Sequence, residues 1–213
     1  MALHGTPAPA SPLTSASHFV KYAMATNRNH ALRPTLWRTC RVLANRQRLR
    51  LLLLLLRGRG MRVSALAEEA GMPVPVCSHY LRMLNARGLL TARRQGRYVS
   101  YRALPDTSQP EAVALLEAVR LSARATASPA AAIYRLATAF THPTRVAIVR
   151  LAAQGPVDER RAAAAAHCSR RAVHRHLDKL VSRRLLHRRR RGYGLARPRD
   201  ALARALIRLA AED

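Results

Sequence analysis

The sequence predicts a mainly α-helical chain with small β-hairpins, organised as two similar units in tandem. Two observations predict this architecture. The chain repeats itself at an offset of about 96 residues, and both copies show the same order of helix, turn and hairpin signals. Three pairs of segments carry the repeat: residues 43–55 with 140–152, 78–90 with 174–186, and 93–98 with 189–194.

The first unit, residues 34–104, contains signals for four helices and one hairpin. Asn45 separates two leucine-rich helices, and Gly71 ends a short third helix. A fourth helix is expected from about Val74 to Ala86, and β-branched and aromatic residues on both sides of Gly96 predict a hairpin. This is the element order of a winged helix-turn-helix domain.

The second unit, residues 131–197, follows the same order. Its helices are expected at 133–140, 144–153, 159–166 and 170–182, and its hairpin at 185–195. The predicted fold class is therefore mainly α with small β-hairpin wings: tandem winged helix-turn-helix domains plus accessory helices.

Three segments lie outside the two units. Residues 1–33, rich in Ala, Pro, Ser and Thr, are expected to form a disordered tail; their lack of Asp and Glu keeps an organellar transit peptide as an alternative. Residues 105–130 are expected to be a linker with a helix, and residues 198–213 a C-terminal helix. Both helices carry an apolar stripe, which would either pack on its own domain or form a dimer contact.

The charge is concentrated in the two units. The formal net charge is +27, of which residues 34–104 contribute +12 and residues 131–197 contribute +13. Because 49% of the residues are hydrophobic, a core can form beneath this basic surface. Such a surface predicts a polyanionic partner. The longest apolar run, Leu51 to Leu56, is too short to span a bilayer, so no membrane partner is expected.

Both units resemble the DNA-binding domain of the ArsR-type (arsenical-repressor) winged-helix family. That family opens its second helix with a sequence like Leu-Ala-Asn-Pro-Thr-Arg-Leu, which Asn45 and Arg48 match in the first unit, although Arg46 replaces the proline. Residues 142–145 match it in the second unit. The family's recognition helix reads like Ser-x-Ser-x-Val-Ser-His-His-Leu, and the matching residues here are Ser78, His79 and Leu81, and Ser169, Val173, His176 and Leu177.

The resemblance implies a transcriptional regulator that binds double-stranded DNA, in the cytoplasm and associated with the nucleoid. We expect either a homodimer or an intramolecular pseudo-dimer of the two units. Two alternatives remain: a nonspecific architectural protein of the nucleoid, and an RNA-binding protein with tandem winged helices.

The leading face of each recognition helix supplies the candidate base contacts. In the second unit these are Arg170, Arg171, His174 and Arg175, with Ser169 as the N-cap. In the first unit Pro73, Val74 and Pro75 occupy the helix start, which leaves Ser78, His79 and Arg82. The wings are expected to grip phosphates through Arg93, Arg94 and Arg97, and through Arg188, Arg189, Arg190 and Arg191.

No metal, cofactor or catalytic chemistry is expected. The resembled family often senses metals through paired cysteines, but the corresponding segment, residues 65–72, contains none. Cys77 and Cys168 stand where the family has apolar core residues, and together with Cys40 they form no CxxC knuckle. The sequence also lacks a P-loop and the HExxH and GxSxG motifs, so an enzyme is not expected.

Overall fold

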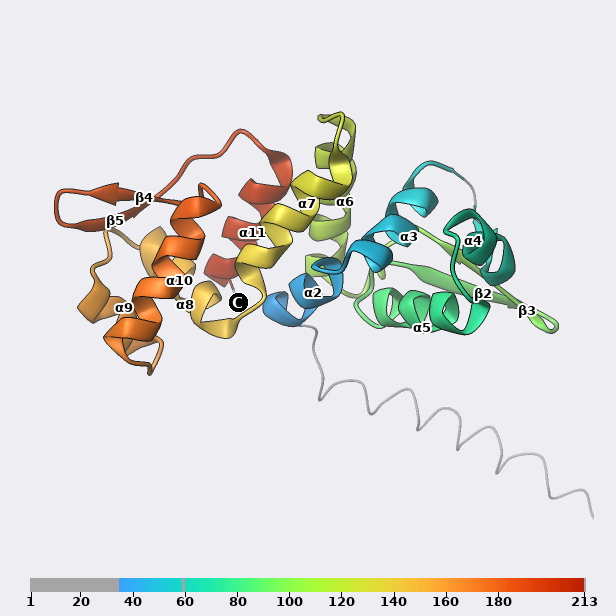
Figure 1. Ribbon diagram of the computed structural model, residues 1–213, viewed down its shortest axis with the longest axis horizontal. Coiled ribbons are helices and arrows are strands. Elements are labelled where there is room, and N and C mark those ends of the chain that lie inside the picture. Colours follow the sequence, from blue (N-terminus) through green and yellow to red (C-terminus); the bar gives the residue numbers. More distant parts are fainter. Residues whose placement is uncertain (1–34, 59, 213) are drawn as a thin grey trace, which may run out of the picture. The chain divides into compact units, whose positions relative to one another are not determined.

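The computed structural model describes residues 35–58 and 60–212, which belong to one compact unit (Figure 1). This part of the chain contains ten α-helices, one short 3-10 helix and five strands. The mainly helical fold with small antiparallel sheets is confirmed. The predicted N-terminal tail lies outside the described residues.

The first predicted unit contains four helices and a three-stranded antiparallel sheet. Its elements are α2 (Leu36–Leu43), α3 (Arg46–Leu56), β1 (Met61–Arg62), α4 (Val63–Glu69), α5 (Val74–Asn85), β2 (Thr91–Gln95) and β3 (Tyr98–Arg102). The strand order is β1-β3-β2, with Met61 opposite Tyr101. The expected hairpin is β2–β3. Strand β1 was not predicted, because two residues are too few to show a periodic pattern.

The second predicted unit follows the same succession. Its elements are α7 (Pro129–Ala137), the 3-10 helix η2 (Thr138–Phe140), α8 (Pro143–Ala153), α9 (Glu159–Ala165), α10 (Arg170–Ser182), β4 (Leu186–Arg189) and β5 (Gly192–Leu195). Val157 forms an isolated antiparallel bridge with Tyr193, beside the two-stranded wing. Helix α10 begins and ends at the predicted residues, because Ser169 caps it and a stripe of apolar side chains is buried beneath it.

Left-handed backbone positions recur at the same spacing in the two units. Gly71 and His167, after α4 and α9, have φ of 58° and 47°; Gly88 and Arg184, before the two wings, have φ of 67° and 59°. Each pair is 96 residues apart. Gly88 has a second reason to be glycine, since a Cβ there would approach the Cβ of Ala112 to 2.9 Å.

The wing turns differ between the units. The sequence repeat aligns Gly96 with Gly192, but only Gly96 lies in a turn, where its φ is 58°. Gly192 is the first residue of β5 and pairs with Arg189, so Arg190 and Arg191 form the turn of the second wing. A Cβ on Gly192 would lie 2.5 Å from the carbonyl oxygen of Val157, which explains glycine at that position.

Two arginines, Arg48 in α3 and Arg145 in α8, hold the end of the preceding helical segment in the same way. The Nε of Arg48 donates to the carbonyl of Val42, and the Nε of Arg145 donates to the carbonyl of Ala139, in both cases six residues earlier. The Nη2 atoms of the two arginines donate to the carbonyls of Arg41 and Thr138, each seven residues before the arginine. A planar guanidinium can make both bonds at once, which a lysine ammonium on its flexible stem does not reproduce.

The helices that follow the two units pack on each other. The apolar stripe of α6 (Pro110–Arg124) is buried, and α6 contacts both α7 and α11 (Ala201–Glu212). The Ser122 hydroxyl in α6 donates to the carboxylate of Asp200, the residue just before α11, at 2.9 Å. Both apolar stripes are therefore covered within the chain.

Contacts between elements of the two units come in matched pairs. Equivalent helices touch each other, α2 with α7 and α6 with α11. Contacts between non-equivalent helices also come in pairs, with α2, α3 and α6 equivalent to α7, α8 and α11. Helix α6 contacts α7 as α11 contacts α2, and α3 contacts α7 as α8 contacts α2. This is the pattern of a two-fold related interface, in which each patch meets its own counterpart.

Candidate nucleic-acid interface

Helix α10 presents three unpaired arginines at its start. The Ser169 hydroxyl accepts the backbone N–H of Ala172 at 3.3 Å, as predicted for the N-cap. Arg170, Arg171 and Arg175 are exposed, and within residues 35–58 and 60–212 their side chains make no hydrogen bond or ion pair. Three free guanidinium groups on the leading turns of a helix can donate to guanine edges or to phosphates.

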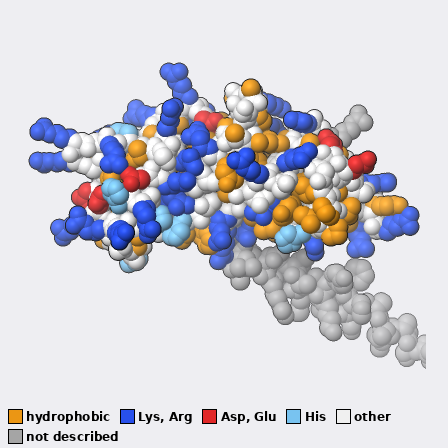
Figure 2. Space-filling model, in the orientation of Figure 1, with side chains coloured by type: hydrophobic (Ala, Val, Ile, Leu, Met, Phe, Trp, Pro, Cys, Tyr) orange, Lys and Arg blue, Asp and Glu red, His pale blue; other side chains and the backbone are white. Residues whose placement is uncertain are grey.

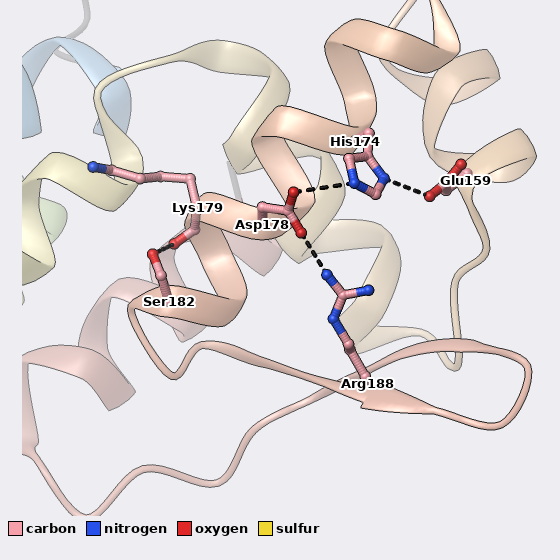
Figure 3. A network of polar contacts seen from close by, with 6 residues as sticks. All are labelled: Glu159, His174, Asp178, Lys179, Ser182 and Arg188. Atoms are coloured by element: carbon pink, nitrogen blue, oxygen red, sulfur yellow. Dashed lines mark hydrogen bonds and ion pairs between the residues drawn. The ribbon is translucent and has the colours of Figure 1, made fainter.

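His174, the fourth candidate on this helix, lies between two carboxylates (Figure 3). Its Nδ1 is 2.8 Å from Glu159 Oε1 at the start of α9, and its Nε2 is 3.1 Å from Asp178 Oδ2, one turn further along α10. The side chain of His174 is 49% exposed. Sequence reasoning missed both acids, although the i,i+4 spacing of His174 and Asp178 was visible.

These contacts favour the protonated form of His174. The hydrogen bond to Glu159 is the largest cause of a raised pKa, and the charge of Asp178 adds to it, while burial and Arg188 act in the opposite direction. Because the pKa in the folded protein lies above the ordinary value of 6.5, the network contributes its full stability below that pH. This contribution is lost as the pH rises through the folded pKa.

We expect an NMR titration to place the pKa of His174 above 6.5 in the wild-type protein. The double substitution Glu159→Gln and Asp178→Asn removes both negative charges, so the pKa of His174 should fall by comparison with wild type. Glu117→Gln, in α6, is a matched control that should leave it unchanged. A wild-type His174 that titrates below 6.5 would contradict the bridged geometry.

Only part of the predicted arginine cluster lies at the tip of the second wing. Arg190 and Arg191 form the exposed turn, whereas Arg188 is a residue of β4 whose Nη2 donates to Asp178 Oδ1 at 2.6 Å (Figure 3). Arg189, also in β4, donates to the His187 ring at 3.2 Å. The four predicted phosphate-binding arginines are therefore divided between strand β4 and the turn. Arg188 ties the wing to α10, a contact that the hairpin register alone could not predict.

The equivalent helix of the first unit begins with an apolar surface. Val74 and Val76 in the first turn of α5 are 49% and 39% exposed, and Pro73 at the N-cap provides no side-chain hydrogen bond. Figure 2 shows apolar side chains gathered over α5, whereas Lys and Arg side chains are spread over much of the visible face. Of the polar candidates, His79 and Arg82 are exposed and Ser78 is half-buried.

The first wing carries exposed cations along one strand and its turn. Arg93 and Arg94 lie in β2, and Arg97 lies in the turn; all three are exposed. Tyr98 stands beside them with the guanidinium carbons of Arg62 and Arg97 at 4.5 and 5.0 Å from its ring centroid. This arrangement places several donors on one hairpin, where they can reach a phosphate backbone.

The cysteines differ in their surroundings. Cys40 and Cys77 are buried, and burial raises the pKa of both thiols, so they pack as small apolar side chains. Cys168, which was expected at a core position, is only half-buried. In the described part of the chain, no group of three or more His, Cys, Asp or Glu side chains could hold a metal ion.

A helix-turn-helix followed by a basic hairpin defines the class of this site: a winged helix-turn-helix DNA-binding element. Residues 45–92, from the cap of α3 into β2, match the family model described as bacterial regulatory protein, arsR family. The chain thus contains one arsR-family helix-turn-helix domain, and this family consists of DNA-binding transcriptional regulators. This match lies within the first unit.

No curated protein and no solved structure matches the chain. None of the helices within the described residues is long and apolar enough to cross a membrane.

Proposed function

We propose that the chain is a sequence-specific regulator of transcription that binds double-stranded DNA in the cytoplasm, at the nucleoid. Residues 34–104 and 131–197 act as two winged helix-turn-helix domains, joined by residues 105–130 and followed by the C-terminal helix. Helices α5 and α10 enter the major groove, and the arginines of the two wings grip the backbone. The protein needs no metal or cofactor for this activity.

We further propose that the two domains form an intramolecular pseudo-dimer. The observation that carries this proposal is the matched set of contacts: α2 with α7, α6 with α11, and the paired contacts between non-equivalent helices. Dimeric helix-turn-helix proteins bind two half-sites one helical turn apart or a multiple of it. Here one chain would bind both half-sites, and the half-sites would be unlike, because the two recognition helices differ.

The second domain is proposed as the principal reader of sequence. Arg170, Arg171 and Arg175 are exposed on the leading face of α10, and their side chains are unpaired within the described part of the chain. Helix α5 has Val74 and Val76 at its start. A bidentate contact between arginine and guanine gives about 1–3 kcal/mol of discrimination. Valine can only touch a thymine methyl group, so the first domain contributes less discrimination.

The test is a binding selection on randomised duplexes with the wild-type protein, Arg170→Ala, Arg175→Ala and the control Val74→Ala. We expect each arginine variant to relax the selected motif at defined base pairs of one half-site, by about 1–3 kcal/mol per contact. Val74→Ala should keep the wild-type motif. An unchanged motif in both arginine variants would show that these residues contact only phosphate.

One observation favours the architectural alternative. The exposed apolar start of α5 cannot form hydrogen bonds to base edges, so the first domain could bind DNA of any sequence. Selection of genomic fragments at about 150 mM salt, where specific and nonspecific affinities separate, distinguishes the two functions. Enrichment of one motif supports regulation, and flat recovery supports an architectural role. A preference for structured RNA over duplex DNA would favour the remaining alternative, an RNA-binding protein with tandem winged helices.

A further inference from the structure

The seam between the two domains carries a cluster of cations without carboxylate partners. Arg175, Lys179 and Arg183 are spaced four residues apart and follow one face of α10, towards its C-terminal end. On the neighbouring elements lie Arg145, in α8, and Arg41, in the last turn of α2. The ion pairs found among residues 35–58 and 60–212 involve none of these five cations.

Two histidines lie within this cluster, with their rings against each other. The ring centroids of His142, the N-cap of α8, and His176, in α10, are 4.7 Å apart. His142 Nδ1 accepts the backbone N–H of Thr144 at 3.2 Å, and Arg145 Nη1 lies 3.2 Å from His176 Nδ1. A guanidinium can only donate, so both Nδ1 atoms are acceptors and each neutral ring keeps its hydrogen on Nε2.

The charges of the cluster act against one another in the free protein. Burial, followed by the charges of His142, Arg145 and Arg175, lowers the pKa of His176 to about 4. Burial, Arg145 and Arg41 lower the pKa of His142. Burial lowers the pKa of Lys179, and Arg183 and Arg145 lower it further. A bound anion would relieve this mutual repulsion.

The cluster lies on a continuous path from one recognition helix to the other. Arg48 contacts α5 through the sulfur of Met83, at 3.5 Å, and through the ring of Tyr80. The same guanidinium donates to the carbonyl of Arg41 at 3.0 Å. Arg41 lies in the last turn of α2, which contacts α8. The N-cap of α8, His142, has its ring against that of His176 in α10. The cation cluster at the boundary of the two domains therefore lies between the recognition helices α5 and α10.

We infer that Arg41, His142, His176 and Lys179 form a phosphate-binding site that holds the DNA backbone between the two half-sites. The inference rests on the proposed function and adds a third contact surface to the recognition helices and wings. The ammonium and guanidinium groups supply charge, and the neutral histidines supply Nε2–H donors. The opposite flank of α10 has a different character, because His174 and Asp178 there are paired with Glu159 and Arg188.

The test compares the salt dependence of binding to a 30-base-pair duplex for the wild-type protein, for Arg41→Gln with Lys179→Gln, and for a control. The control, Arg124→Gln with Arg208→Gln, removes two exposed cations from α6 and α11, outside the proposed interface. For the double variant of Arg41 and Lys179 (the seam variant), we expect the affinity at 0.1 M salt to fall about eightfold per lost phosphate contact. The slope of log K against log salt should become shallower by about 0.9 per lost contact. The control should keep the wild-type slope.

Lys179→Gln alone repeats the test at one site and should show about half of the change in slope. Circular dichroism and thermal unfolding establish that each variant is folded. Seam variants with the affinity and slope of the control would overturn the inference and leave the proposed function standing. A wild-type protein that does not bind the duplex would overturn both.

Discussion

The affinity of the wild-type protein for duplex DNA is expected to fall by about 10³ to 10⁵ between 50 and 200 mM salt. Nearly all of the net charge of +27 lies in the two winged units, where the cations of both wings are exposed. If the protein neutralises about six to ten phosphates, the slope of log K against log salt should be about −5 to −9. Fluorescence anisotropy over a salt series measures it. A slope shallower than about −2 would remove duplex DNA as the main partner.

The second wing should account for a defined part of this slope. Replacing Arg190 and Arg191 by Ala removes the two cations of the exposed turn, and should weaken binding to all sequences about equally while making the slope shallower by about 2. Arg124→Ala with Arg208→Ala removes the same charge elsewhere and should have a much smaller effect. Loss of preference for one sequence alone would mean that the wing reads bases.

Arg145→Ala is expected to destabilise the fold by about 3 kcal/mol, because it leaves carbonyls of the η2 segment without their donor. The guanidinium donates to the carbonyls of Ala139 and Thr138 and to the Thr141 hydroxyl, the last at 2.7 Å. Urea unfolding followed by circular dichroism measures the loss. Arg145→Lys should recover little of it, because one ammonium cannot reproduce the planar fork.

Two further variants define the specificity of this effect. Arg48→Ala removes the equivalent bonds in the first unit and should cost a similar amount. Arg175→Ala removes an exposed arginine whose side chain has no hydrogen-bond or ion-pair partner among residues 35–58 and 60–212, and should change stability by no more than about 0.5 kcal/mol. If Arg145→Ala were as stable as Arg175→Ala, these carbonyl contacts would not hold the helix end.

The sequence by itself determined the architecture within each unit, because the signals that carry it are local. The cap at Ser169 and the apolar periodicity behind it set the limits of α10, and turn residues such as Gly96 marked the first wing. A hydrogen bond within one turn depends on residues three or four positions apart, so its signal can be read along the chain. The concentration of charge in the two units was likewise a matter of composition.

Only the tertiary structure decided which side chains meet. It paired His174 with Glu159 and joined Arg188 of the wing to Asp178, so two residues predicted to contact DNA are held by carboxylates in the free protein. It also brought the rings of His142 and His176 together, where the sequence showed two separate motif positions. These contacts join residues on different elements, and their geometry follows from how helices and hairpins pack, which neither periodicity nor capping specifies.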